Sequence, residues 1–290
     1  MHTRISLFLF SLLCATVLHA EEIRMAASDL LADFISPPLT TFAEENNLDL
    51  KIDGIGSLPA MDRLRSDEID LAIIAIPEGE KVPRDQFNVY PLAYDTSVIV
   101  VNSGNPMDEI SIPRLGGIFG SNEEFNFNTW GELGLAGWGS RNIKPLVGPA
   151  EASISLELCR YTVLSGGAMK PSVAALRNTE IEAAIAGNIA AIGVLSSRPK
   201  NKDLKVLMIS ETDDVNTPAY GPTAEIIHLG DYPIRLAFYI VYSPRDEAKI
   251  KPVLRALLED EIAAVLDKNH LFALPDTVRR QLLIDLNFQN

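Results

Sequence analysis

The stretch Pro91-Leu-Ala-Tyr-Asp-Thr-Ser-Val-Ile-Val-Val-Asn-Ser-Gly-Asn-Pro106 divides the chain into two halves of different character. Within it, Ser97 to Val101 is largely apolar and β-branched, which favours a buried strand, and the turn-forming residues Asn102 to Pro106 end that strand. A second such passage, Pro218-Ala-Tyr-Gly-Pro-Thr-Ala-Glu-Ile-Ile, precedes the last strands and helices. Two crossover passages predict two lobes with a cleft between them.

The first 20 residues have the layout of a secretory signal peptide. Arg4 precedes an apolar run from Ile5 to Leu18, and Ala20 precedes the first acidic residues, Glu21 and Glu22. The run is shorter than the roughly 20 residues of a membrane-spanning helix. We predict a signal peptide over residues 1–20, cleavage after Ala20 and a periplasmic location; the alternative is a buried N-terminal helix.

The composition limits which partners the protein can bind and which interactions can stabilise its fold. The chain has 290 residues, 47% of them hydrophobic, and a net charge of −14, which disfavours nucleic acid and anionic membranes as partners. Cys14 would leave with the signal peptide, so Cys159 would be the only thiol and no intramolecular disulfide could form. Stability must therefore come from packed cores, which a chain of this length can form.

The first part of the chain alternates strands and helices. Ile23 to Ala27 predicts a strand and Ser28 a helix cap, with Pro37-Pro38 interrupting the helix that follows. Gly54 to Pro59 leads into a second helix, and Asp70 to Ile76 is apolar after its first residue, as in a strand buried on both faces of a parallel sheet. This alternation predicts an α/β fold with helix starts at the strand ends.

The second part is less regular. Asn122 to Gly139 has no clear period and predicts a long surface loop, whereas Val173 to Leu176 predicts a helical segment. Near the C-terminus, Pro252 is placed to open a helix, and an apolar stripe runs from Val253 to Leu266.

Signatures of enzymes and metal sites are scarce. His228 and His270 are the only histidines after residue 20, and neither has a cysteine or carboxylate at ligand spacing. The sequence contains no nucleophile elbow, zinc-protease motif, P-loop or dinucleotide-binding glycine motif. We predict a protein that is not an enzyme and that needs no metal or other cofactor.

Serines recur where helices begin. Ser28, Ser57, Ser153 and Ser155 each lie at a predicted helix start. A helix N-terminus presents unpaired N–H groups and a partial positive charge, so several such starts meeting in one cleft could bind an anion. Each serine alone is also explained as a plain helix cap.

The chain resembles the phosphate-type substrate-binding proteins of bacterial ABC importers. The resemblance covers nearly all of the chain after residue 20 and rests on Tyr90 to Pro106, Ile118-Phe-Gly with Trp130-Gly-Glu-Leu-Gly, Ala190 to Val194, and most specifically Gly221-Pro-Thr-Ala-Glu-Ile-Ile with Gly230-Asp-Tyr-Pro-Ile-Arg. It implies a two-lobed type II periplasmic binding protein fold, in which each lobe is a mixed sheet flanked by helices and two crossover strands join the lobes. The lobes implied are residues 21–96 plus 225–290 and residues 97–224.

The resemblance also implies a ligand site. Ser28 matches the family's first-lobe hydroxyl, Gly56-Ser57 its second phosphate loop, and Ser153-Ile154-Ser155 its serine-glycine-threonine helix start. Two positions depart from the family: Ala75 replaces the aspartate that accepts the phosphate proton, and Pro149 replaces the arginine.

The function implied is capture of a small oxyanion, phosphate first, by a monomeric exported protein that delivers it to the membrane permease of an ABC importer. Because Ala75 and Pro149 replace a charged acceptor and a charged donor, we expect modest affinity and less than about tenfold preference for phosphate over sulfate. The alternative is a sensor or scaffold that has lost phosphate binding and acts with a membrane partner. An enzyme on the same fold is a third, weaker reading.

Overall fold

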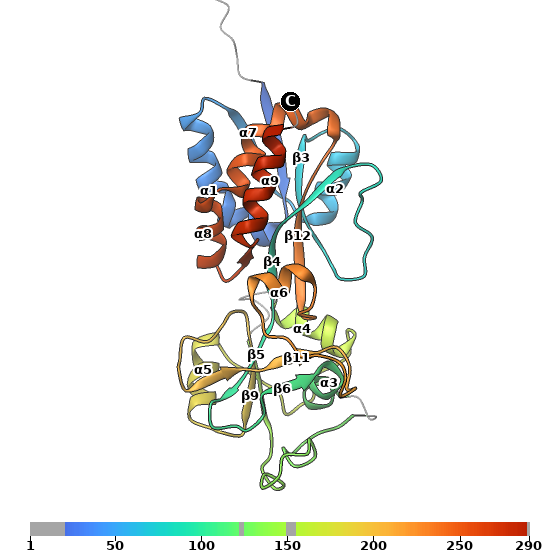
Figure 1. The fold of residues 1–290 in the computed structure, drawn as a ribbon, viewed down its shortest axis with the longest axis vertical. Coiled ribbons are helices and arrows are strands. Elements are labelled where there is room, and N and C mark those ends of the chain that lie inside the picture. The colour runs from blue at the N-terminus through green and yellow to red at the C-terminus, as the bar shows by residue number, and fades with distance from the viewer. Residues whose placement is uncertain (1–20, 122–124, 149–154, 289–290) are drawn as a thin grey trace, which may run out of the picture.

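The computed structural model describes residues 21–121, 125–148 and 155–288, and it consists of two lobes, one above the other in Figure 1. Ser153, Ile154 and Pro149 lie outside the described residues. None of the helices within the described ranges is long and apolar enough to cross a bilayer.

The upper lobe is built on a six-stranded sheet with strand order β13-β4-β12-β3-β1-β2. β1 pairs in parallel with β2 and β3, and β12 runs antiparallel to β3 and β4. The carboxyl ends of β1, β3 and β4 and the start of β12 therefore lie along one edge, which faces the lower lobe; we call it the cleft edge. The strands are β1 (Glu22–Ala27), β2 (Asp49–Gly54), β3 (Leu71–Ile76), β4 (Asn88–Thr96), β12 (Arg235–Tyr242) and β13 (Phe272–Ala273).

Helices cover both faces of this sheet (Figure 1). Ile73 packs in a core with the apolar sides of α1, α7, α8 and α9, and its neighbour Ile74 packs in a second core with α2. Because successive side chains of a strand point to opposite faces, this explains why β3 is apolar throughout. The helices are α1 (Asp29–Glu45), α2 (Ser57–Arg65), α7 (Glu247–Leu258), α8 (Asp260–Lys268) and α9 (Asp276–Phe288), with a short 3-10 helix η1 (Pro244–Asp246) before α7.

The lower lobe contains a five-stranded sheet, β10-β5-β9-β7-β8, and a separate pair, β11-β6. The strands are β5 (Val98–Asn102), β6 (Glu109–Ser111), β7 (Lys144–Val147), β8 (Ala174–Ala175), β9 (Ala191–Leu195), β10 (Leu204–Val206) and β11 (Met208–Ser210). The helices are α3 (Ile112–Phe119), α4 (Ser155–Leu164) and α5 (Asn178–Ala186), and α6 (Ala224–Leu229) lies where the chain returns to the upper lobe. α4 and α6 lie between the sheets of the two lobes (Figure 1).

The two crossovers run side by side between the lobes. β4 leads into β5 through Thr96 and Ser97, both fully buried, and the chain returns from α6 into β12. The Ser97 N–H donates to the Ile234 carbonyl (3.2 Å), and the Tyr232 hydroxyl donates to the Ser97 carbonyl (2.8 Å). The predicted two-lobed α/β fold with two crossover strands is confirmed.

Packing overrides local proline signals in two helices. α1 continues through Pro37 and Pro38, because its buried face, which includes Ile35 and Leu39, stays packed on the sheet on either side of the prolines. The prediction that they interrupt the helix was wrong. Pro252 lies inside α7 instead of opening it.

Two further expectations were wrong. The apolar stripe after Pro252 belongs to two helices, because Glu259 adopts an extended backbone (φ −73°, ψ 161°) between α7 and α8. Ala174 and Ala175 form strand β8 rather than a helical turn, since they pair with Leu146 and Val147 at the end of the sheet.

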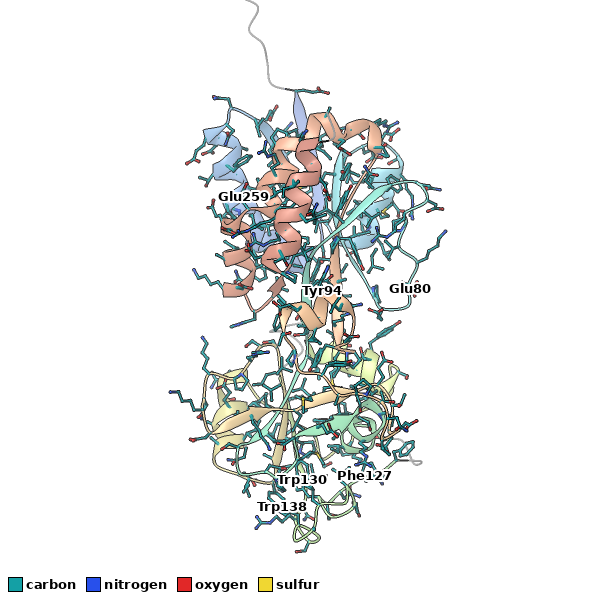
Figure 2. The ribbon with its side chains drawn as sticks, viewed as in Figure 1. Glu80, Tyr94, Phe127, Trp130, Trp138 and Glu259 are labelled. Carbon is teal, nitrogen blue, oxygen red and sulfur yellow. The ribbon has the colours of Figure 1, made fainter. Side chains whose placement is uncertain are left out.

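The predicted loop after Asn122 contains no helix and no named strand in its described part, but it is anchored. Trp130 is completely buried, and its Nε1–H donates to the Ala190 carbonyl (2.9 Å). Figure 2 shows Phe127, Trp130 and Trp138 together at the end of the lower lobe farthest from the cleft edge.

Candidate functional site

The helix starts of the upper lobe meet at the cleft edge. Ser28 directly follows β1 and precedes α1, and it is 1% exposed. Its N–H donates to the Ile73 carbonyl of β3 (2.7 Å), and its carbonyl accepts from Leu31 and Ala32. The Ser28 side chain makes no capping hydrogen bond, so its hydroxyl is not used to close the helix.

Gly56 and Ser57 form the second helix start. Gly56 has φ +84°, a left-handed conformation that favours glycine. Ser57 is the first residue of α2, and its Oγ accepts a hydrogen bond from the Ala75 N–H (2.9 Å). The serine hydroxyl therefore joins the end of β3 to the start of α2, and it still has its own O–H to donate.

A carboxylate that the sequence reading missed lies beside this helix start. A Cβ built on Gly56 would lie 3.9 Å from Oδ1 of Asp29, the first residue of α1. The same Oδ1 accepts from the Leu30 N–H (3.2 Å). Asp29 thus brings negative charge to the point where α1 and α2 begin. In the sequence, the signal for Asp29 is its place directly after Ser28, the predicted helix cap.

The second-lobe part of the predicted site is largely outside the described residues. Ser153, Ile154 and Pro149 are not described, and Ser155 is described only as the first residue of α4. The structure therefore brings together Ser28, Gly56 and Ser57, and it leaves the other three predicted residues untested.

A pocket of about 580 Å³ lies between the lobes at the cleft edge. The upper lobe and the return crossover contribute Glu78, Arg235, Gly230 and Pro233, and the lower lobe contributes Ile112, Tyr161, Thr162, Ser165 and Glu211. Both lobes line it, so a ligand there would contact both.

Arg235, at the start of β12, places a guanidinium group in this pocket. The sequence analysis did not single out this residue. Its side chain is 13% exposed, its Nη1 donates to the Ile227 carbonyl (2.7 Å), and its Nη2 pairs with Glu78 (3.0 Å). Its guanidinium carbon lies 5.5 Å from the centre of the Tyr94 ring, within reach of a cation–π interaction. In the sequence, a lone arginine at the start of an apolar strand was the only signal.

Two more titratable groups lie next to the pocket. The Tyr94 hydroxyl and Nδ1 of His228 are 3.0 Å apart, and Tyr94 lies at the boundary of the lobes (Figure 2). Burial raises the pKa of Tyr94 to about 12, while burial and then the charge of Arg235 lower the pKa of His228. Both side chains are therefore neutral at pH 7.

Asp95, at the end of β4, is an ionisable group at the crossover itself. It is 8% exposed, and its Oδ1 accepts from the Thr96 N–H (2.7 Å). Burial raises the pKa of Asp95 to about 7. Among the residues that the structure describes, no group of three or more His, Cys, Asp or Glu side chains could hold a metal ion.

A family model described as "PBP superfamily domain" matches residues 18–260, most of the chain. The chain belongs to this family. Among curated proteins, none matches it.

Solved structures with the same fold include two whose titles name phosphate and a third that is named PstS. The "possible phosphate binding protein" of Planctomyces limnophilus is 17% identical, with 92% of this chain and 98% of that chain covered and a TM-score of 0.69. The ABC-type phosphate transport receptor of Vibrio cholerae is 19% identical, with 88% and 100% covered and a TM-score of 0.61. PstS of Borrelia burgdorferi is 14% identical, with 88% and 100% covered and a TM-score of 0.70.

These similar structures agree with the type II periplasmic binding protein fold that the sequence resemblance implied. At such identities they show the fold of this PBP-superfamily chain. They leave the ligand to be argued from the residues of this chain.

Proposed function

We propose that this protein is an exported solute-binding protein that captures a small oxyanion, most readily phosphate, in the cleft between its lobes for an ABC importer. The observation that carries the proposal is the meeting of the α1 and α2 starts at the cleft edge. There, Ser57 keeps an O–H to donate, and the N-termini of the two helices add partial positive charge.

In this proposal binding involves no covalent step. The lobes, residues 21–96 plus 225–290 and residues 97–224, would close on the ligand by rotation at the two crossovers, and Ser153, Ile154 and Ser155 would complete the site from the lower lobe. The processed protein would be periplasmic and monomeric, with the importer's permease as its partner.

Calorimetry of the processed protein tests the anion site directly. We expect phosphate binding to weaken at least about tenfold in a Ser57→Ala plus Ser153→Ala variant, because each hydroxyl lost removes a hydrogen bond to a charged group. Ser66→Ala is the matched control, since Ser66 follows the last residue of α2 and its hydroxyl bonds locally, to Asp62, Arg63 and Glu68. If the variant binds phosphate with wild-type affinity, the anion site does not lie at the cleft edge.

The alternative is a sensor or scaffold that binds no free anion. Two observations favour it: Asp29 places a carboxylate at the helix starts, and Glu78 already pairs with Arg235. In that case no oxyanion would raise the melting temperature in a thermal-shift screen. The gene of this protein would then be expected next to genes for a membrane kinase or a secretion apparatus, and not next to genes for an importer.

A further inference from the structure

A second cavity opens on the upper lobe, between α2 and the segment that follows β3. Its volume of about 600 Å³ falls within the range of about 300–1,000 Å³ that is usual for small organic ligands. It differs from the pocket between the lobes, because the residues that line it all belong to the upper lobe. Glu80, one of these residues, lies at the end of that lobe nearest the lower lobe (Figure 2). The cavity therefore opens beside the cleft edge.

Met61, Ile74 and Ile76 form an apolar floor in this cavity. All three are buried and belong to one hydrophobic core between α2 and the sheet. Leu58 lies three residues before Met61 and so on the same face of α2, and it is 81% exposed. An exposed leucine beside an apolar floor leaves apolar surface in water, and a ligand that covers this surface gains hydrophobic free energy.

The rim of the cavity carries more positive than negative charge. Of the residues that line it, Arg65 and Lys81 are basic and Glu80 is acidic. Arg65 pairs with Asp62 (3.2 Å) and Lys81 with Asp85 (3.3 Å), but both pairs are exposed to solvent. Such pairs contribute little, so either cation can turn towards a bound anion at little cost. In a chain with a net charge of −14, this local excess of positive charge favours an anionic ligand.

Ser57 belongs to this cavity as well as to the proposed oxyanion site. Its Oγ accepts from the Ala75 N–H (2.9 Å), and Ala75 lines the cavity too. The O–H of Ser57 is therefore a hydrogen-bond donor in the wall of the cavity. An oxyanion bound at Ser57 would have the apolar floor directly next to it.

We propose that the protein also binds organic oxyanions, in which the oxyanion is bonded to an apolar group, as in an alkylphosphonate. The oxyanion accepts a hydrogen bond from the Ser57 O–H, and the apolar group lies on the floor formed by Met61, Ile74 and Ile76. The cations of the rim attract the negative charge. This inference rests on the proposed function for the oxyanion end and adds a class of ligand to it.

Calorimetry with pentylphosphonate and methylphosphonate tests the inference, because the two probes share the phosphonate and differ by four methylene groups. Each methylene group that leaves water completely favours binding by about fourfold. Because the rim is open, part of the chain stays in water. We therefore expect pentylphosphonate to bind about ten- to thirtyfold more tightly than methylphosphonate.

Substitutions in the cavity wall should change this ratio. Met61→Gln should lower it, because the alkyl chain would cover an amide that has lost its water, whereas Met61→Leu keeps the floor apolar and should keep most of the ratio. Leu58→Asn changes an exposed side chain, so folding is not at risk, and should lower the ratio by about two- to threefold. Ile284→Asn is the matched control, since Ile284 is exposed on α9 and does not line the cavity. In every variant, an unchanged affinity for methylphosphonate shows that the oxyanion end is intact.

The outcomes separate the two proposals. If phosphate and methylphosphonate bind and the longer chain adds no affinity, or if the ratio stays unchanged in both Met61→Gln and Leu58→Asn, the inference fails and the proposed function stands. If none of the three anions binds, the proposed function fails and the inference fails with it. A ratio that falls in Met61→Gln and Leu58→Asn, and not in Met61→Leu or Ile284→Asn, supports the inference.

Discussion

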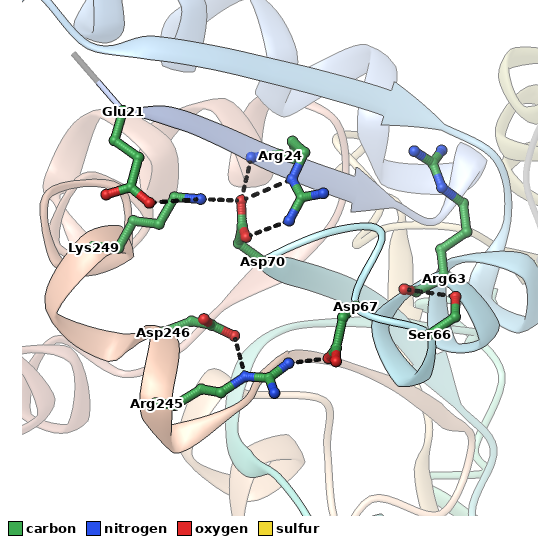
Figure 3. A network of polar contacts seen from close by, with 9 residues as sticks. All are labelled: Glu21, Arg24, Arg63, Ser66, Asp67, Asp70, Arg245, Asp246 and Lys249. Carbon is green, nitrogen blue, oxygen red and sulfur yellow. Dashed lines mark hydrogen bonds and ion pairs between the residues drawn. The ribbon is translucent and has the colours of Figure 1, made fainter. Parts of the chain in front are cut away.

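A buried aspartate lies at the cleft edge of the upper sheet and another at the opposite ends of the strands, which we call the far edge, and the pKa values of the two are shifted in opposite directions. At the far edge, Asp70 receives hydrogen bonds from Arg24 and Lys249 (Figure 3). Burial opposes its ionisation, but these bonds outweigh burial and lower the pKa of Asp70 to about 2. At the cleft edge, the one hydrogen bond that Asp95 makes within the described residues comes from the neighbouring Thr96 N–H, and burial raises the pKa of Asp95 to about 7.

The difference separates residues that hold the lobe together from residues that are left for binding or movement. The Asp70 network joins β1, the start of β3 and α7, so it ties the returning C-terminal segment to the first strand. The cleft edge instead keeps spare donors on Ser57 and Arg235, beside the carboxylates of Asp29 and Glu78. Predictions of stability therefore concern the far edge and the crossover, and predictions of affinity concern the cleft edge.

The largest effect is expected from Asp70→Asn. The substitution leaves Arg24 and Lys249 without their shared anion, and breaking a largely buried ion pair costs about 2–4 kcal/mol when one partner is partly exposed. Urea unfolding at pH 7 measures the loss. Asp67→Asn is the matched control, because the Asp67–Arg245 pair is exposed to solvent and should contribute little to stability. Equal losses would contradict the assignment of stability to the buried network.

Asp95 should make the protein less stable as pH rises. Its folded pKa is about 7, above the roughly 3.9 of an unfolded chain, so folding favours the protonated form. This contribution is complete below about pH 4 and is lost as pH rises to about 7. Asp70 has the opposite sign: its contribution is present above about pH 4 and is lost as pH falls towards 2.

Asp95→Asn should therefore stabilise the protein at pH 8, by a few kcal/mol at most, and change little at pH 4. Unfolding free energies at the two pH values decide it, with Asp67→Asn again as the control. If the variant shows the same gain at both pH values, the effect does not come from the titration of Asp95.

Asp29 should control the choice between oxyanions. A carboxylate repels sulfate and can accept a hydrogen bond from the O–H of hydrogen phosphate, so Asp29→Asn should raise sulfate affinity by about tenfold and phosphate affinity less. Competition calorimetry with both anions gives the ratio. A variant that binds both anions with wild-type affinities would place the anion away from the starts of α1 and α2.

Glu78→Gln should have the smallest effect. It removes the partner of Arg235 and leaves the guanidinium free for an anion, but Glu78 is 65% exposed, so the pair is screened by solvent. We expect phosphate to bind about two- to fivefold more tightly at low salt, with the gain shrinking as salt is added. Weaker binding in this variant would indicate that Glu78 itself contacts the ligand.

Much of the fold follows from sequence pattern, because strands buried on both faces, such as β3, must be apolar throughout and crossovers end in turn residues. The failures have one physical origin. Pro37 and Pro38 remain in α1, and Ala174 pairs as a strand, because contacts with distant residues outweigh local preference.

The sequence by itself determined the β/α alternation of the upper lobe, the two crossovers, and the serines at the starts of α1 and α2. Only the tertiary structure decided that Ser57 bonds to Ala75, that Asp29 lies beside Gly56, and that Arg235 meets Glu78 in the pocket between the lobes. Elements are set by the spacing of neighbouring residues, which a sequence displays directly. A site is set by which strand ends meet at one edge, and that depends on the strand order of the folded sheet.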